Sequence, residues 1–265
     1  MRISVITPTF NCAAGLDRTL RSVRLQSYPD VEHIVVDGGS SDETAALLAS
    51  HHAGPWVSEP DTGLYDAINK GLAMATGSIV GVLGAGDFLA RRETLSILTS
   101  PLKSSEITAV YSDVAFVRPT NTDRVVRYFS SASFRPGMFL NGYMPAHPTF
   151  YARLEMLRKL VGYRQDYRIC GDYELLLRYM LIHNFRTEYV PGLAVVMETG
   201  GVSNASPLSR LHLNEEMVRA CRDNNIQARL PQMAWKYPTK VREFVTPRLR
   251  QASEAPTKVD SSWMQ

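Results

Sequence analysis

The chain has 265 residues, of which 45% are hydrophobic and 21% are charged, and its formal net charge is +3 at pH 7. That length can bury a substantial core within one α/β domain. A net charge of +3 is too small to indicate nucleic-acid binding, which usually requires a dense basic face, so we expect no nucleic-acid partner. The three cysteines are widely separated, and no stretch approaches the ~18 apolar residues of a membrane span, so we expect reduced thiols and a cytoplasmic protein.

Strand-like and helix-like segments alternate through the first hundred residues. Four short apolar runs favour β-strands, at residues 3–7, 31–36, 56–58 and 78–83. Helical patterns lie between them, and the third repeats Leu64, Ile68 and Leu72 every four residues. Ser40 and Glu43 fit a capping box at the start of the second helix. The alternation predicts βαβ units, and therefore an α/β fold with a mostly parallel sheet flanked by helices.

The pattern changes beyond residue 105. Further strands are expected at residues 109–117, 124–129, 149–151 and 188–197, with a hairpin joining the first two and an interruption at Pro191 in the last. Helices are expected at residues 134–140, 152–160 and 170–183. We expect one domain at residues 1–205, followed at residues 206–265 by a helical, basic C-terminal extension with a disordered tail.

Polar side chains follow the predicted strands, at the edge of a parallel sheet where ligands bind. Asp37 ends the second strand and precedes two glycines. Its carboxylate can accept hydrogen bonds from nucleobase N–H groups, although turn chemistry explains the neighbouring serines as well. On the third helix, Asp66, Asn69 and Lys70 share one face, a pattern that an ordinary Asp–Lys surface pair also produces. Gly71 costs this helix ~1 kcal/mol relative to Ala and indicates close packing on the sheet.

Two carboxylates later in the chain, Asp87 and Asp172, are candidates for a metal ligand and a general base. Asp87 ends a Gly-Ala-Gly-Asp turn after the fourth strand, where it can hold Mg²⁺ or Mn²⁺ against a diphosphate. Such sites use one or two carboxylates and complete the shell with phosphate oxygens and water. The alternative is an exposed Asp in a glycine turn. Asp172 opens the helix expected at 170–183, where it is either a general base or the helix N-cap.

The order of these motifs resembles family 2 glycosyltransferases of the GT-A fold. The resemblance spans about residues 2–205 and is carried by residues 4–11, 36–42, 59–61 and 63–71. The most similar subgroup builds bacterial exopolysaccharide and lipopolysaccharide. The resemblance implies a Rossmann-like GT-A sheet and an inverting enzyme that takes a sugar from a nucleotide diphosphate donor, a UDP-sugar being favoured. The implied acceptor is a glycan or a lipid-linked molecule.

The resemblance also implies roles for individual residues. Those expected at the donor are Pro8, Thr9, Asn11, Asp37, Asp61, Asp66, Asn69 and Lys70. Asp87 is implied as the metal carboxylate and Asp172 as the catalytic base, while residues 147–151 and 200–203 suggest acceptor-side and lid elements. The family typically shows two carboxylates near the position of Asp87, whereas this chain has one. We therefore expect Mg²⁺ or Mn²⁺ to bind weakly before the donor nucleotide.

Two other functions remain open. A sugar nucleotidyltransferase can share this kind of sheet, but it needs a basic, Gly-rich loop after the first strand, and residues 10–15 contain no basic side chain. A non-catalytic scaffold that binds nucleotide sugars is supported by the thinned metal motif, while the retained Asp172 argues against it.

Aromatic and basic side chains mix over residues 235–250. Such a segment can lie on an anionic bilayer, where each basic residue adds about 1 kcal/mol. The alternative is a solvated basic helix, and Pro238 and Pro247 interrupt any long amphipathic face. Peripheral contact with the inner face of the cytoplasmic membrane is therefore one of two expectations for this segment.

Overall fold

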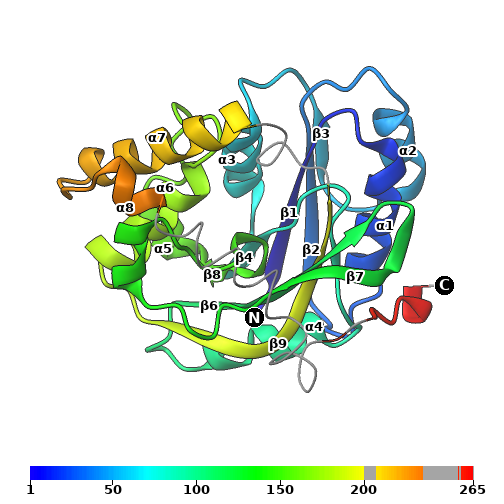
Figure 1. Ribbon diagram of the computed structural model, residues 1–265. Helices are drawn as coiled ribbons and strands as arrows, with labels where there is room; N and C mark the ends of the chain where they lie inside the picture. The colour runs from blue at the N-terminus through cyan, green and yellow to red at the C-terminus, as the bar shows by residue number, and fades with distance from the viewer. Residues whose placement is uncertain (200–206, 235–255, 257, 265) are drawn as a thin grey trace.

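A mixed sheet forms the centre of the molecule (Figure 1). The computed structural model describes residues 1–199, 207–234, 256 and 258–264. The strands are ordered β3-β2-β1-β4-β8-β6-β9-β5, and β7 pairs with β6. Their bounds are β1 Ile3–Thr9, β2 Val31–Asp37, β3 Trp56–Ser58, β4 Ile79–Val82, β5 Phe88–Leu89, β6 Ala109–Arg118, β7 Asn121–Phe129, β8 Tyr151–Arg153 and β9 Thr187–Glu198.

The directions of the strands bring several carboxyl ends to one edge of the sheet. β1 is parallel to β2 and β4, and β2 is parallel to β3, which confirms the predicted parallel half. β8 is antiparallel to both β4 and β6, so β6 and its parallel neighbour β9 run in the same direction as β1. β5 and β7 are antiparallel additions to β9 and β6. The ends of β1, β2, β4 and β9 therefore share an edge.

Helices cover both faces of this sheet, which confirms the predicted α/β class. They are α1 Ala13–Arg24, α2 Thr44–His51, α3 Leu64–Met74, α4 Thr94–Leu98, α5 Leu154–Lys159, α6 Gly171–Leu177, α7 Pro207–Asp223 and α8 Leu230–Ala234. Ile34 and Val36 of β2 belong to the core cluster that holds side chains of α3 and α6. Val35, between them, packs with Leu16 of α1 and Leu48 of α2. Because successive strand residues face opposite ways, the two groups of helices lie on opposite sides.

The predicted capping box at the start of α2 is wrong. The helix begins at Thr44, and Ser40 instead donates its hydroxyl to the Asp37 carboxylate. Asp42, and not Ser40, accepts from backbone N–H groups at the helix starts. Its Oδ1 accepts from the Thr44 N–H at 3.0 Å, and its Oδ2 accepts from the Ala13 N–H at 3.2 Å. One carboxylate thus serves the N-termini of both α1 and α2, where negative charge is favourable.

Several boundaries in the second half also differ from prediction. Where a helix was expected at residues 134–140, the structure has a 3₁₀-helix, Pro136–Asn141. The helix expected at 170–183 is α-helical only to Leu177 and continues as a π-helix, Arg178–Ile182. β9 continues through the expected interruption, because Gly192 adopts φ +115° and the pairing with β6 shifts register there.

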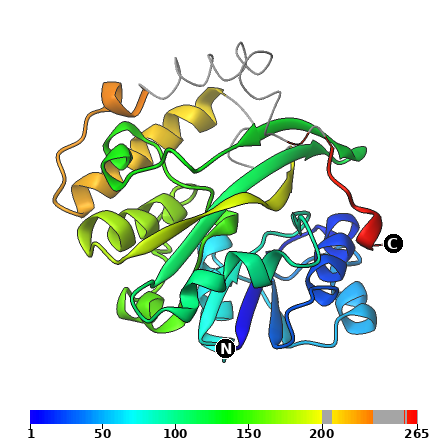
Figure 2. The same ribbon diagram turned by 90° about the horizontal axis from the view of Figure 1, so that it is seen from below.

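The described C-terminal segments pack against the rest of the fold. Met217 and Cys221 of α7 are buried in the main core cluster. Residues 258–264, within the tail expected to be disordered, bury Val259 and Met264 with Phe88, and Figure 2 shows this segment beside α1. Residues 235–250 and the lid residues expected at 200–203 lie outside the described residues.

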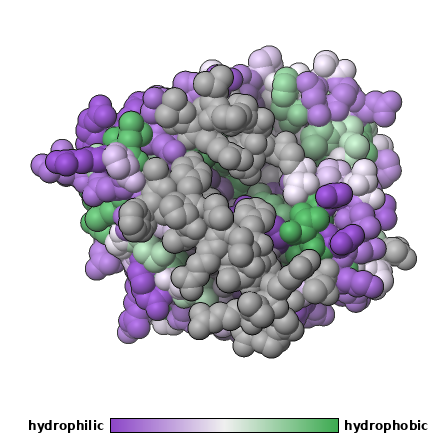
Figure 3. All heavy atoms as spheres, viewed as in Figure 1, coloured by the Kyte–Doolittle hydropathy of each residue, from purple (hydrophilic) through white to green (hydrophobic). Residues whose placement is uncertain are grey.

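The outer surface gives no sign of a membrane-spanning element in the described residues. No helix there is both long and apolar enough to cross a bilayer. Figure 3 shows mainly hydrophilic residues around the described rim of one face, with apolar residues in small separate patches.

Gly71 generates a prediction about packing. A Cβ at this position would lie 2.4 Å from Cγ2 of Ile6 in β1, so the close approach expected from the sequence is confirmed. We predict that Gly71→Ala lowers the free energy of unfolding by about 1–3 kcal/mol in urea titration, because overpacking outweighs the gain in helix propensity. The control is exposed Ala73 on the same helix, where Ala73→Gly should cost about 1 kcal/mol. A stabilised Gly71→Ala variant would show that the helix can move away from β1.

Candidate active site

Asp37 organises the junction between β1 and β2. Thr9 and Asp37 are register partners at the ends of these strands, and the Gly38 N–H donates to the Thr9 carbonyl at 2.9 Å. Asp37 is fully buried. Its Oδ2 accepts from the Ser58 hydroxyl at 2.6 Å and from the Ser40 N–H at 3.1 Å. A nucleobase that meets Asp37 must share or replace these contacts, so its expected role at the base stays a prediction.

Asn11 ties the loop after β1 to the loop after β2. Its backbone adopts φ +48°, and its N–H donates to the Ser40 hydroxyl at 2.7 Å. Its side-chain oxygen accepts from the Ser41 N–H at 2.9 Å. Pro8 is buried within β1, where it has no N–H to donate. Asn11 therefore shapes this edge through its backbone and its side chain, and Pro8 through its backbone.

Thr9 and Phe10 place a buried hydroxyl and an exposed aromatic ring at this edge. The Thr9 hydroxyl is buried and has no hydrogen-bond partner among the described residues. Phe10, the next residue, is 63% exposed. A buried hydroxyl without a partner is costly, and an exposed aromatic ring can stack on a base, so both features suit an incoming nucleotide.

Asp61 brings a third loop to the same place. A Cβ at Gly38 would lie 2.5 Å from Oδ2 of Asp61, so the glycine is needed for this carboxylate to lie over the backbone. Oδ1 of Asp61 accepts from the Gly63 N–H at 2.9 Å. The loops after β1, β2 and β3 thus converge as the sequence predicted.

The polar face of α3 holds neighbouring segments. Lys70 pairs with Glu59 at 2.8 Å and with Asp66 at 3.7 Å. Asn69 donates to the Tyr163 carbonyl at 2.7 Å and accepts from the Tyr163 N–H at 2.9 Å. Asn69 thereby fixes the loop before α6, and donor contacts for these three α3 residues stay predictions.

Asp87 lies beside a second carboxylate, Glu198 at the end of β9. The pairing of β5 with β9 brings Glu198 Oε2 within 3.5 Å of where a Cβ on Gly86 would stand. Thr19 of α1 fixes the loop: its hydroxyl donates to the Asp87 carbonyl at 2.7 Å and accepts from the Gly86 N–H at 3.0 Å. Glu198 forms an ion pair with Arg18, also of α1.

Burial raises the pKa of Asp87 to about 8. The negative charge of Glu198 contributes to this rise, whereas a hydrogen bond from the Glu198 N–H opposes it. No group of three or more potential metal ligands occurs among the described residues. Two carboxylates nevertheless fit a divalent ion whose other ligands are phosphate oxygens and water.

Asp172 lies in the first turn of α6. The N-cap of α6 is Cys170, and Oδ1 of Asp172 accepts from the Tyr173 N–H at 2.7 Å, so the N-cap alternative is wrong. The Tyr65 hydroxyl lies 3.4 Å from the same oxygen. Burial raises the pKa of Asp172, and the neighbouring imidazole of His147 lowers it.

The sequence decides the family. Residues 4–182 match the model of glycosyl transferase family 2. The chain belongs to this family. An uncharacterized glycosyltransferase of Mycobacterium tuberculosis is 35% identical over 185 residues, which cover 68% of this chain and 69% of the relative. A PGL/p-HBAD biosynthesis glycosyltransferase of the same species is 32% identical over 208 residues, covering 76% and 78%.

Solved structures support the GT-A fold of this glycosyltransferase. A mannosyltransferase from Pyrobaculum calidifontis, in complex with GDP-Man and Mn²⁺, aligns with a TM-score of 0.63 at 21% identity, covering 96% of this chain and 76% of its own. TarS residues 1–349 from S. aureus, in complex with UDP-GlcNAc, align with a TM-score of 0.62 at 15% identity, covering 83% and 66%. The protein is a glycosyltransferase, so the nucleotidyltransferase alternative falls away.

The sequence of this glycosyltransferase gave no indication of Glu198, and no individual roles were expected for Phe10 and His147. Glu198 is the last residue of the last strand, but the sequence does not show that β9 pairs with β5 beside Asp87. Phe10 had a usable signal, an aromatic residue just after a buried strand. His147 lies near Asp172, whose pKa its imidazole lowers, and its Nε2 lies 2.8 Å from the Tyr163 hydroxyl.

One hollow of the glycosyltransferase lies away from this edge. It has a volume of about 470 Å³ and is lined in part by Glu106, Arg186 and Glu188, near the amino ends of β6 and β9. Ligands of such sheets bind beyond the carboxyl ends, so we place the active site at the opposite edge.

The raised pKa of Asp87 predicts how stability depends on pH in the metal-free glycosyltransferase. Between the ordinary pKa of 3.8 and about 8, the unfolded chain loses a proton that the folded protein keeps. Stability from this residue is therefore lost as pH rises through that range. We predict that Asp87→Asn, melted in EDTA, unfolds a few degrees above the parent at pH 7.5, with the gap closing towards pH 4. Asp17→Asn on the surface of α1 is the control, and a gap independent of pH would contradict the prediction.

Proposed function

We propose that the glycosyltransferase transfers a sugar with inversion from a nucleotide diphosphate sugar, with Asp172 as the catalytic base. The observation that carries this proposal is the placement of Asp172. It does not cap α6, it is half-buried, and burial raises its pKa. A carboxylate whose pKa moves towards the working pH accepts a proton more effectively than an exposed one.

The reaction is one displacement at the anomeric carbon. Asp172 accepts the proton of the acceptor hydroxyl as that oxygen attacks. The bond between the anomeric carbon and the donor phosphate oxygen breaks, and the electron pair leaves with the nucleotide diphosphate. Because the attacking and leaving oxygens lie on opposite sides, the anomeric configuration inverts. The Tyr173 N–H donates to the Asp172 carboxylate, and the Tyr65 hydroxyl lies 3.4 Å from the same oxygen.

Asp87 and Glu198 would hold Mg²⁺ or Mn²⁺ in this proposal. When bound, the ion neutralises charge that develops on the departing diphosphate. Arg18 forms an ion pair with Glu198, so one of the two negative charges is already balanced. The Mn²⁺ complex of the Pyrobaculum mannosyltransferase supports this assignment by analogy.

The donor is proposed to be a UDP-sugar, although two nucleotides occur among the structural neighbours. TarS was solved with UDP-GlcNAc and the Pyrobaculum enzyme with GDP-Man. The proposed acceptor is a glycan or lipid-linked molecule in exopolysaccharide or lipopolysaccharide synthesis. One relative is named for PGL/p-HBAD biosynthesis, so relatives at this identity serve other pathways as well. A thermal-shift panel of UDP- and GDP-sugars selects the donor, since a ligand at 100 times its Kd stabilises by ~2.7 kcal/mol.

Peripheral attachment at the inner face of the cytoplasmic membrane is proposed for residues 235–250. Support comes from their mixed aromatic and basic sequence and from the proposed lipid-linked acceptor. Neither argument involves the described core of the enzyme.

Asp172→Asn tests the base. Asn keeps the shape of the side chain but cannot take a proton at neutral pH, so kcat should fall by ~10²-fold or more. The Kd for UDP, measured by calorimetry, should barely change, because the donor loops are contributed by β1, β2 and β3. Turnover is measured as nucleotide released from the donor that gives the largest thermal shift. Near-normal turnover in a folded Asp172→Asn variant would remove Asp172 from the mechanism.

A further inference from the structure

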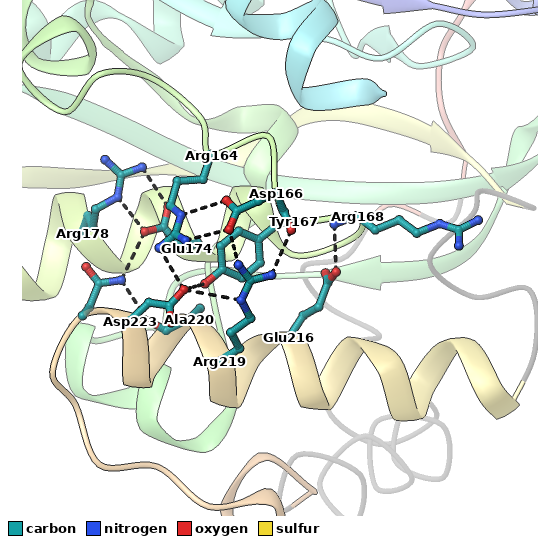
Figure 4. Close-up of polar contacts among 11 residues, drawn as sticks. Arg164, Asp166, Tyr167, Arg168, Glu174, Arg178, Glu216, Arg219, Ala220 and Asp223 are labelled. Carbon is teal, nitrogen blue, oxygen red and sulfur yellow. Dashed lines mark hydrogen bonds and ion pairs between the residues drawn. The ribbon is translucent and has the colours of Figure 1, made fainter. Parts of the chain in front are cut away.

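Helix α7 lies along the loop that leads into α6 (Figure 4). Glu216 of α7 accepts hydrogen bonds from three successive backbone N–H groups of that loop, those of Arg168, Ile169 and Cys170, each at 2.8 Å. Charge-assisted bonds of this kind are stronger than bonds between neutral groups. One side chain therefore fixes the backbone immediately before the first turn of α6.

The same backbone is held from its other side by α3. The Tyr65 hydroxyl donates to the Ile169 carbonyl at 2.6 Å and lies 3.4 Å from Oδ1 of Asp172. Ile169 is thus fixed at its N–H by Glu216 and at its carbonyl by Tyr65. A shift of this residue would move Tyr65 and Asp172 relative to each other.

A separate set of contacts attaches α7 to this loop without Glu216. The Tyr167 ring lies between the guanidinium groups of Arg164 and Arg219, whose central carbons are 5.0 and 4.5 Å from its centroid. The Tyr167 hydroxyl donates to Asp223 at 2.8 Å, and Arg164 pairs with Asp223 at 2.9 Å. These contacts, together with the buried Cys221, predict that α7 stays docked when Glu216 is changed.

We propose that Glu216 is a positioning residue for the base: it sets the place of Asp172 against the acceptor through the backbone of residues 168–170. The inference rests on the proposed role of Asp172 as the base. Substitution by Gln leaves one acceptor oxygen and turns an NH₂ group towards backbone donors, so at least one N–H loses its partner. The start of α6 then relaxes, and misplacement by about 1 Å can cost up to ~10²-fold in rate.

The test compares Glu216→Gln with Glu215→Gln, its neighbour on the same helix. Glu215 is exposed and its carboxylate faces His212 at 3.3 Å, so the control removes the same charge without touching the loop. We expect Glu216→Gln to lower kcat by about tenfold, with the Kd for UDP unchanged, and Glu215→Gln to behave as the parent. Circular dichroism and melting curves establish that each variant is folded, and Glu216→Asp, which keeps both oxygens, should recover part of the loss.

A double-mutant cycle with Asp172→Asn separates positioning from general stabilisation. If Glu216 acts through Asp172, Glu216→Gln should cost less than twofold in the Asp172→Asn background, because the residues work as a unit. An equal loss in both backgrounds, or no loss in the single variant, overturns the positioning role and leaves the base intact. Near-normal turnover of Asp172→Asn alone overturns the base instead, so the two failures are distinguishable.

Discussion

The parallel register of β1 with β2 is the constraint on which the active site depends. It places Thr9 opposite Asp37 at the ends of these strands, and Gly38 then turns the chain beneath Asp61. Parallel strands must return by crossovers, and the loops after β1, β2 and β3 each lead into a helix that covers one face. The edge consequently collects polar groups from loops that are far apart in sequence, above a core that excludes water.

Charge balance at this edge explains why the site is poised for a ligand. Asp87 and Glu198 are brought together by strand pairing, and only Arg18 forms an ion pair with either carboxylate among the described residues. Burial beside a like charge is what raises the pKa of Asp87, and it costs stability at neutral pH. A divalent cation bound with a diphosphate would remove that cost. The protein thus places a buried carboxylate, which costs stability without a cation, where the proposed reaction needs a metal ligand.

Much of the parallel half could be predicted because its signals are local. The repeat of Leu64, Ile68 and Leu72 marked α3, and the family motifs placed polar residues at strand ends. Glu198 was missed because its position depends on the pairing of β9 with β5, between segments about a hundred residues apart. The sequence left Asp172 as either the N-cap of α6 or a general base. The cap role depends on where α6 begins, and the structure excludes it because Cys170 is the N-cap.

Calorimetric titration of Mn²⁺, with and without UDP, tests most directly whether this edge is the donor site. We predict little heat from Mn²⁺ alone, since two carboxylates, of which Glu198 is paired with Arg18, supply few ligands, and clear binding once UDP adds its phosphate oxygens. Glu198→Gln should weaken that second titration, whereas Glu215→Gln on α7 should leave it unchanged. Tight binding of Mn²⁺ without UDP, or binding with UDP that survives Glu198→Gln and Asp87→Asn together, would contradict the account.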